Sequence, residues 1–481
     1  MGYAHTMKSG RHIARLTAVL GLVGAIVIIP TASQLVSTVQ AVPCTLCEGG
    51  EFHPLTPTRI FDSRLGALSN HDVPPVGAKP LHAPEPATFD IDLLGLGGIP
   101  LASADVLAVV VNITVTDAGA GGYLEAYGKG ARPAVRTSII NFSAGDTVPN
   151  ASIVRPGLDG DLTIGLFGQS SSANVIVDVF GWFSTSSYVP ASGTADPGAR
   201  LIPTTPSRVL DTRPGPLNVN RVSGTPLSAQ ETMVLPILGV DGINPAITDV
   251  VPNLPNVTGV LLNVVGITGS VSTHLSVFPD DLGGQAPTTS NLNLGPNAIK
   301  ANLVFVPVGS DGNVRIFNNQ GLTDVVADVV GYMQTGAEEI TRKGRVVPLS
   351  SPYRTFDTRD PQFGGVALGP GQAEDWSFAA FASSVVIGPD AVGKQLAVIG
   401  NLTSASLTRQ YASAFVRSFL TAYPASATRP LSSNLNSVEG PAPIPNMAIL
   451  KYGTDATVRM YNLAGYEHYL FDASAVVLAD P

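Results

Sequence analysis

One polar motif, Arg-x-x-Asp-x-Arg, occurs three times in this 481-residue chain. A carboxylate beside two guanidinium groups can form bidentate ion pairs, either to lock the fold or to bind an anion or glycan. In an extended strand the aspartate and the second arginine share a face, and the first arginine points to the opposite one. Because only 13% of residues are charged, we favour a buried clamp between the first and last strands of a unit. The copies are Arg59, Asp62 and Arg64; Arg208, Asp211 and Arg213; and Arg354, Asp357 and Arg359.

Four further polar positions recur after each motif. An asparagine lies in an apolar strand, a second closes a Ser-x-x-Asn segment, a third follows nine or ten residues later, and an aspartate lies in the closing strand. Some of these asparagines lie in glycosylation sequons and their counterparts do not, so we expect the side chains to bond backbone groups at bulges or loops. The positions are Asn112, Asn263 and Asn401; Asn141, Asn293 and Asn436; Asn150, Asn302 and Asn446; and Asp178, Asp328 and Asp472.

Residue types that usually perform catalysis do not recur. No histidine, glutamate, lysine or cysteine occupies matching positions in the three units, although acid–base and nucleophilic catalysis need such groups in partnership. Unmatched candidates such as Glu125, Glu467 and His468 have polar or turn-forming neighbours that suggest exposed loops. The Asp159-Gly160-Asp161 segment offers too few oxygens for a calcium site. We therefore expect no catalytic residue, no metal and no cofactor, and a protein that is not an enzyme.

The spacing of the motif indicates the domain organisation. The central aspartates lie 149 and 146 residues apart (211 − 62 and 357 − 211), which is a domain length and too long for a solenoid unit. Short Val-, Ile- and Thr-rich segments alternate with Gly, Pro, Asn and Asp, as in antiparallel sandwiches. The runs Val175–Val179 and Val325–Val329, which are apolar except for Asp178 and Asp328, suggest central strands covered on both faces. Asp159-Gly160 and Asp311-Gly312 are read as hairpin turns.

The sequence thus predicts an all-β fold of three tandem antiparallel β-sandwich-like domains after an N-terminal signal segment. The second and third units are each preceded by a small, polar or charged connector. The predicted parts are a signal peptide at 1–41, a leader at 42–52, β domains at 53–183, 201–333 and 346–481, and linkers at 184–200 and 334–345.

The N-terminus has the pattern of an export signal. Lys8, Arg11 and Arg15 precede an apolar run at Leu16–Ile29, and a small residue at Ala41 suits cleavage. The alternative is an uncleaved anchor, which would be the protein's one link to a membrane. Cys44 and Cys47 follow in the leader, where a local disulfide is favoured over a cross-link to another chain.

The pattern resembles repeat modules of secreted actinobacterial cell-surface proteins. Those modules open on Asp-Thr-Arg, continue through Ser-Asn-Leu-Asn and close on Val-Ala-Asp-Val-x-Gly-Tyr. The second unit matches at Asp211–Arg213, Ser290–Asn293 and Val326–Tyr332. The first unit departs at Ser63, and the third lacks the closing Gly-Tyr. The resemblance covers about His53 to the end, and it implies a cell-surface location without a settled activity.

Charge narrows the function further. A net charge of −9 argues against a nucleic-acid partner. We expect a secreted or cell-surface, non-catalytic envelope protein, structural or adhesive, with a cell-wall or surface glycan or other envelope proteins as partners. The alternative is an accessory or catalytic part of a secreted cell-wall or polysaccharide hydrolase.

Overall fold

The structure is a computed structural model that describes 48–64, 81–82, 87–157, 159–168, 172–186, 188–190, 198–215, 224–243, 247–279, 281, 285–336, 341–382, 394–406, 416–437 and 443–480. The predicted signal peptide, Cys44 and Cys47 lie outside these residues. Cys44–Pro481 forms one compact unit. Strands account for 59% of the structure and helices for 3%, which confirms the all-β prediction.

The first repeat forms two antiparallel sheets. Its inner sheet has the order β1-β9-β4-β7, with β2 also paired to β9, and its outer sheet has the order β3-β8-β5-β6. The strands are β1 (Phe52–Asp62), β2 (Leu81–His82), β3 (Ala87–Asp92), β4 (Val106–Thr116), β5 (Gly122–Gly128), β6 (Ile140–Phe142), β7 (Val148–Val154), β8 (Asp161–Phe167) and β9 (Ser172–Ser184).

The second repeat has the same two sheets and one addition. Its inner sheet is β10-β19-β14-β17, its outer sheet is β11-β18-β15-β16, and β12 pairs with β13. The strands are β10 (Arg200–Asp211), β11 (Glu231–Pro236), β12 (Val240–Gly242), β13 (Ile247–Val251), β14 (Val257–Thr268), β15 (Thr273–Pro279), β16 (Leu292–Leu294), β17 (Ile299–Pro307), β18 (Asn313–Asn318) and β19 (Thr323–Gln334).

The third repeat follows the same order. Its inner sheet is β20-β27-β22-β25 and its outer sheet is β21-β26-β23-β24. The elements are β20 (Val346–Asp357), the 3₁₀ turn η2 (Pro361–Phe363), β21 (Ala373–Ser377), α1 (Ala379–Ala382), β22 (Gln395–Ser406), β23 (Ser418–Pro424), β24 (Leu435–Ser437), β25 (Ile444–Lys451), the 3₁₀ turn η4 (Thr454–Ala456), β26 (Thr457–Asn462) and β27 (Glu467–Leu478). Among the described residues, no helix is long and apolar enough to span a bilayer.

Each inner sheet is covered on both faces. One face packs on the outer sheet of its own repeat, and the other face contributes to a central core that all three repeats share. Leu107 and Ile153 of repeat 1, Leu261 of repeat 2, and Ile399 and Val477 of repeat 3 all belong to this central core. Double coverage explains why the predicted runs Val175–Val179 in β9 and Val325–Val329 in β19 are apolar except for the clamp residues Asp178 and Asp328.

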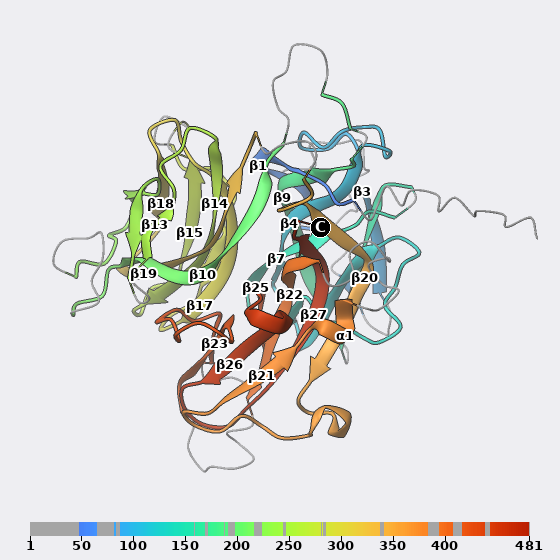
Figure 1. The fold of residues 1–481 in the computed structure, drawn as a ribbon. Coiled ribbons are helices and arrows are strands. Elements are labelled where there is room, and N and C mark those ends of the chain that lie inside the picture. The colour runs from blue at the N-terminus through green and yellow to red at the C-terminus, as the bar shows by residue number, and fades with distance from the viewer. Residues whose placement is uncertain are drawn as a thin grey trace, which may run out of the picture. The chain divides into compact units, whose positions relative to one another are not determined.

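The shared core changes the predicted arrangement. The six main sheets form a propeller-like ring of six blades rather than three separate sandwich domains, with strands of the three repeats side by side near the centre (Figure 1). The edge strands β7, β17 and β25 contact one another pairwise there. Tandem sandwiches were expected because the sequence pattern shows that a strand is buried, and it does not show which repeat buries it.

The segments that join the repeats also pair with one another. Phe52 and Ala199 exchange backbone hydrogen bonds of 2.7 and 2.8 Å, and Gly50 and Val346 exchange bonds of 2.9 and 3.0 Å. Gly198 has φ +77°, and a Cβ there would lie 2.7 Å from the Cβ of Glu51, so the close approach requires glycine. Strand β9 ends at Ser184 and β10 begins at Arg200.

The Asp-Gly segments turn the chain, but they do not make hairpins. Gly160 and Gly312 have φ values of +89° and +83°, which is the left-handed conformation expected of them. Each turn nevertheless leads from the inner sheet to the outer sheet, from β7 to β8 or from β17 to β18. In the third repeat Asp455 and Ala456 adopt positive φ values instead. The hairpin prediction was wrong because a tight turn specifies chain reversal and does not specify pairing of its flanking strands.

A shared core predicts that Cys44–Pro481 unfolds as one unit. Leu261→Ala, which leaves a cavity in the central core, should lower the melting temperature of a single transition, with a loss of about 2–5 kcal/mol in unfolding free energy. Val234→Ala, at a 41% exposed position of the same repeat, is the matched control and should change little. Calorimetry makes the test. Three transitions, with only one of them shifted by Leu261→Ala, would contradict the shared core.

Candidate functional site

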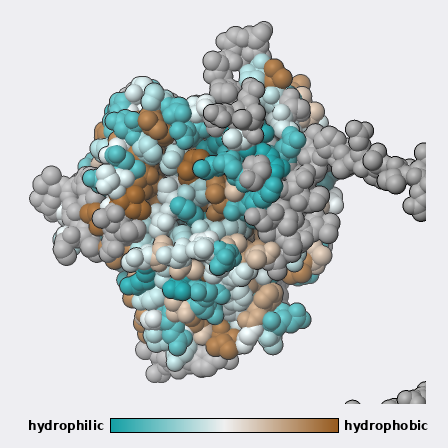
Figure 2. Space-filling view, in the orientation of Figure 1, coloured by the Kyte–Doolittle hydropathy of each residue, from teal (hydrophilic) through white to brown (hydrophobic). Residues whose placement is uncertain are grey.

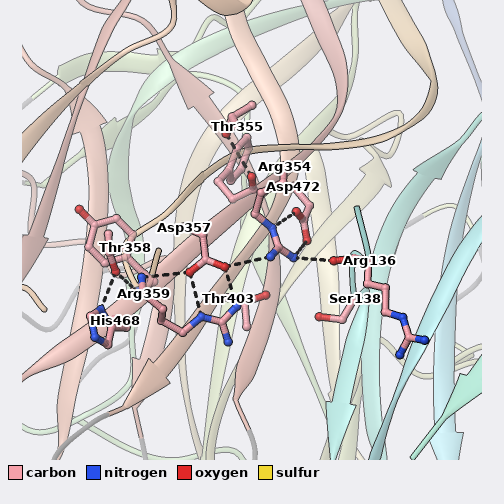
Figure 3. A network of polar contacts seen from close by, with 12 residues as sticks. Arg136, Ser138, Arg354, Thr355, Asp357, Thr358, Arg359, Thr403, His468 and Asp472 are labelled. Carbon is pink, nitrogen blue, oxygen red and sulfur yellow. Dashed lines mark hydrogen bonds and ion pairs between the residues drawn. The ribbon is translucent and has the colours of Figure 1, made fainter. Parts of the chain in front are cut away.

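The Arg-x-x-Asp-x-Arg motif builds a charged clamp in every repeat. In repeat 3, Arg354 donates from Nε and Nη2 to Asp472 at 2.6 and 3.0 Å, and from Nη1 to Asp357 at 2.9 Å (Figure 3). Arg359 donates to the same Asp357 carboxylate at 2.8 and 2.6 Å. The clamp therefore ties the first strand, β20, to the last strand, β27, as the sequence suggested.

The other two repeats reproduce this geometry. Arg59 lies 2.9 Å from Asp178, and Arg208 lies 2.9 Å from Asp328. The second arginines, Arg64 and Arg213, pair with Asp62 and Asp211 at 2.6 and 2.7 Å. These are the expected ion pairs, although Arg64 and Arg213 lie just beyond the ends of β1 and β10, where strand alternation does not apply.

One detail of the strand argument was wrong. The first arginine also contacts the motif aspartate, at 3.4 Å between Arg59 and Asp62 and 3.1 Å between Arg208 and Asp211. A register shift after the first arginine in β1, β10 and β20 brings these side chains to one side. Strict alternation does not apply across a β-bulge.

Burial and pairing shift the aspartates in opposite directions. Burial opposes ionisation of Asp62 and Asp357, but hydrogen bonds from Arg64 and Arg359 outweigh it and lower both carboxyl pKa values. In the closing strands, burial dominates and raises the pKa of Asp178 and Asp472, although Arg59 and Arg354 oppose the shift. Asp62 and Asp357 are thus the firmly ionised members of their clamps.

Two clamps also reach the neighbouring repeat. Arg208 Nη2 donates to the carbonyl of Leu431 in repeat 3 at 3.0 Å, and Arg354 Nη2 donates to the carbonyl of Arg136 in repeat 1 at 3.0 Å. Each of these guanidinium groups therefore bonds a first strand, a last strand and another repeat.

The third asparagine series forms a cyclic set of bonds between repeats, which we call the asparagine ring. Asn302 donates to Asn112 Oδ1 at 3.0 Å, Asn446 to Asn263 Oδ1 at 2.8 Å, and Asn150 to Asn401 Oδ1 at 2.8 Å. Repeat 2 thus bonds repeat 1, repeat 3 bonds repeat 2, and repeat 1 bonds repeat 3. This order closes a pseudo-threefold cycle within one chain.

Backbone groups complete the asparagine ring. Asn302 Oδ1 accepts from Ala151 N of repeat 1 at 3.2 Å, while Asn302 Nδ2 also donates to Asn291 O of its own repeat at 2.7 Å. Asn112 in turn donates to Ser290 O of repeat 2 at 3.0 Å. The predicted backbone bonds are present, but many of them join different repeats rather than stabilising a local bulge.

The Ser-x-x-Asn asparagines act locally. Asn141 and Asn293 each donate at 3.0 Å to the serine three residues earlier, Ser138 or Ser290. Asn436 accepts from Ser433 at 3.3 Å. These contacts shape the segments whose carbonyls the asparagine ring uses.

The unmatched acidic candidates are not in exposed loops. Glu125 lies in β5 and Glu467 in β27, both almost fully buried, and His468 is buried beside Glu467. Glu125 pairs with Arg132 at 3.2 Å, and Glu467 accepts from Ser404 at 2.7 Å. Neighbouring residues in sequence did not reveal this burial because strand pairing, not local polarity, places these side chains.

A cavity of about 580 Å³ lies where the N-terminal ends of β7, β17 and β25 meet, and we call it the axial pocket. All three repeats contribute to its wall. The lining residues are Asn141, Ser143, Asp146, Val148, Pro149, Leu292, Asn293, Gly295, Pro296, Asn297, Ala298, Ile299, Lys300, Ala301, Arg417, Pro443, Ile444 and Pro445. This volume is in the range of small-ligand sites.

Lys300 and Arg417 are the cationic residues of the axial pocket wall, and sequence reasoning missed both. Neither residue recurs, so comparison of the repeats gave no signal for them. A second cavity, of about 240 Å³, lies between repeats 2 and 3 and shares Ile299 and Arg417 with the axial pocket. Within the described ranges, no group of three or more His, Cys, Asp or Glu side chains could hold a metal ion.

Comparisons with known proteins add little. No protein-family model and no curated protein matches the chain. Three similar solved structures share 9% identity with it. The chain of a triple jelly roll fold from an archaeal virus has a TM-score of 0.18 and coverage of 89% of this chain and 90% of that one. A chain of Sulfolobus turreted icosahedral virus has a TM-score of 0.17 and coverage of 88% of this chain and 91% of that one. A CBM22 tandem domain of Paenibacillus barcinonensis has a TM-score of 0.15 and coverage of 60% of this chain and 99% of that one. TM-scores this low do not establish a shared fold.

The asparagine ring predicts a sharp difference between two similar substitutions. Asn302→Asp places a buried carboxylate opposite Asn112 Oδ1 and Asn291 O, which are both acceptors. We expect a loss of about 3–5 kcal/mol in unfolding free energy, measured by urea denaturation at pH 7. The same change at exposed Asn253 should cost under about 0.5 kcal/mol. Equal unfolding free energies of the two variants would show that the hydrogen bonds of the asparagine ring do not stabilise the fold.

The clamp of repeat 3 predicts a pH dependence. Because the folded-state pKa of Asp357 is lowered, its ionisation stabilises the fold above the unfolded carboxyl value of about 3.9, and this contribution disappears as the pH falls through the folded value. Wild type should therefore melt well above Asp357→Asn at pH 7, and the gap should narrow below about pH 4. Thermal melts of both proteins from pH 7 to pH 3 measure this difference in melting temperature. A gap that stays constant or widens on acidification would be inconsistent with this role.

Proposed function

We propose that this is a secreted, non-catalytic protein of the cell envelope or surface, with a structural or adhesive role and a surface glycan as its ligand. The observation that supports it most is the use of the recurring polar residues. The charges of the clamps and the amides of the asparagine ring are occupied by one another and by backbone groups, so most of the groups that define the repeat build the scaffold.

The surface is compatible with a polar partner. On the face drawn in Figure 2, hydrophobic side chains lie in small groups between hydrophilic ones. Strongly exposed large hydrophobic residues such as Leu101, Val189 and Val366 come from three separate parts of the sequence. Scattered apolar residues are ordinary at a surface, whereas a broad apolar patch would favour a lipid or an obligate protein partner.

The second candidate is an accessory or catalytic part of a secreted hydrolase. The buried Glu125 and Glu467 are the acidic groups closest to a catalytic description. Each is engaged by a neighbour of its own repeat, Arg132 or Ser404. This arrangement favours binding over hydrolysis.

Sedimentation with isolated envelopes tests the proposal. The secreted chain should bind saturably to protease-treated envelopes and lose binding when the glycans are oxidised with periodate, without releasing reducing sugar, peptide or ester products. Heat-unfolded protein is the control for non-specific adsorption. Binding that survives periodate and is lost after protease treatment would replace the glycan with an envelope protein. Reproducible turnover would replace the non-catalytic role.

A further inference from the structure

The axial pocket departs from the pseudo-threefold pattern at one charged position. Two residues before each asparagine of the ring, the repeats carry Val148, Lys300 and Ile444. Two walls of the pocket are therefore apolar at this level, and the third carries an ammonium group. A scaffold that needed only packing here could have used an aliphatic residue in all three repeats.

Lys300 has fewer partners than a partly buried ammonium can use. Its Nζ donates to Thr147 O at 3.1 Å, and it forms no ion pair with any described residue. An ammonium group has three donors, and loss of water is costly unless they are satisfied. Burial lowers the pKa of Lys300, and Asp146 acts weakly in the opposite direction. An anionic group in the pocket would supply the missing acceptors and favour the charged form.

The neighbouring charges leave the pocket positive. Asp146 is the acidic side chain in the wall, and its carboxylate accepts from Ser143 N at 2.7 Å. Arg417 is exposed and forms no hydrogen bond or ion pair with the described residues. Among the described residues of the wall, Lys300 and Arg417 against Asp146 give one excess positive charge, in a chain whose net charge is −9. One excess charge suits a singly charged carboxylate better than a doubly charged phosphate.

The rest of the wall suits a sugar ring. Asn141, Asn293 and Ser143 offer amide and hydroxyl groups that can donate to and accept from sugar hydroxyls, while Ile299 and Pro445 contribute apolar surface. We propose that the axial pocket binds a carboxylate-bearing sugar, a hexuronate unit, and that Lys300 recognises its carboxylate. The inference rests on the proposed function in taking a glycan as the ligand.

Isothermal titration with a defined uronic-acid trisaccharide and its carboxyl-reduced, neutral counterpart tests the assignment. The wild-type chain should bind the acidic form about tenfold more tightly. Lys300→Met should lose this preference, and Lys300→Arg should retain most of it because the charge remains. Lys343→Met removes an exposed lysine outside the pocket wall and should leave the preference unchanged. Thermal melts of all variants establish that they are folded.

Three results would overturn the assignment. They are equal affinity for the acidic and neutral trisaccharides, an acid preference that survives in folded Lys300→Met, and displacement of the uronate by an equal concentration of inorganic phosphate, which would indicate a non-selective anion site. The envelope assay separates this failure from that of the proposed function. Envelope binding without uronate binding removes the pocket and leaves the proposed function, whereas uronate binding without envelope binding does the opposite.

Discussion

The cyclic contact between the three repeats is the constraint on which the rest of the structure depends. Each inner sheet is apolar on both faces, so a single repeat would leave Leu261, Phe305 or their counterparts in water. Apolar packing drives the repeats together without fixing how they align. The asparagine ring supplies the alignment, because the donors and acceptors of Asn302 meet those of Asn112 and Ala151 in one register only. Burying unsatisfied amides would make other registers costly.

The asparagine ring fixes the alignment of the repeats at the centre, and the charged clamps fix the pairing of strands at the edges of the inner sheets. Strands β1, β10 and β20 are each the first strand of a repeat and pair with its last, β9, β19 or β27. A β-bulge lets one arginine contact two carboxylates, so the charges are balanced where the strand is irregular. Arg208 and Arg354 then use a remaining N–H on the next repeat. Breaking one clamp would therefore weaken a strand pairing and, in these repeats, a contact between repeats.

The repeat period, the all-β class and the partners within each clamp could be predicted from the sequence, because these features follow from residue spacing and strand chemistry. The asparagine ring could not be predicted from the sequence. Asn150 and Asn401 are 251 residues apart, and nothing near either residue indicates that the other completes its hydrogen bonds. The side of the strand on which Arg59 lies depended on a bulge, and the burial of Glu467 depended on long-range pairing. Local patterns are informative about local structure, and these features were decided by tertiary contacts.

The pseudo-threefold scaffold also separates structural residues from candidate functional ones. A residue that performs the same packing task in three equivalent places is expected to recur, as the clamp and ring residues do. A pocket on the pseudo-threefold axis is different, because one ligand lies against all three repeats and meets three non-identical walls. Recognition of an asymmetric ligand then requires that the repeats differ there. Lys300 opposite Val148 and Ile444 is such a difference. The comparison of repeats that identified the scaffold so clearly is, for this physical reason, unable to detect the residues most suited to binding.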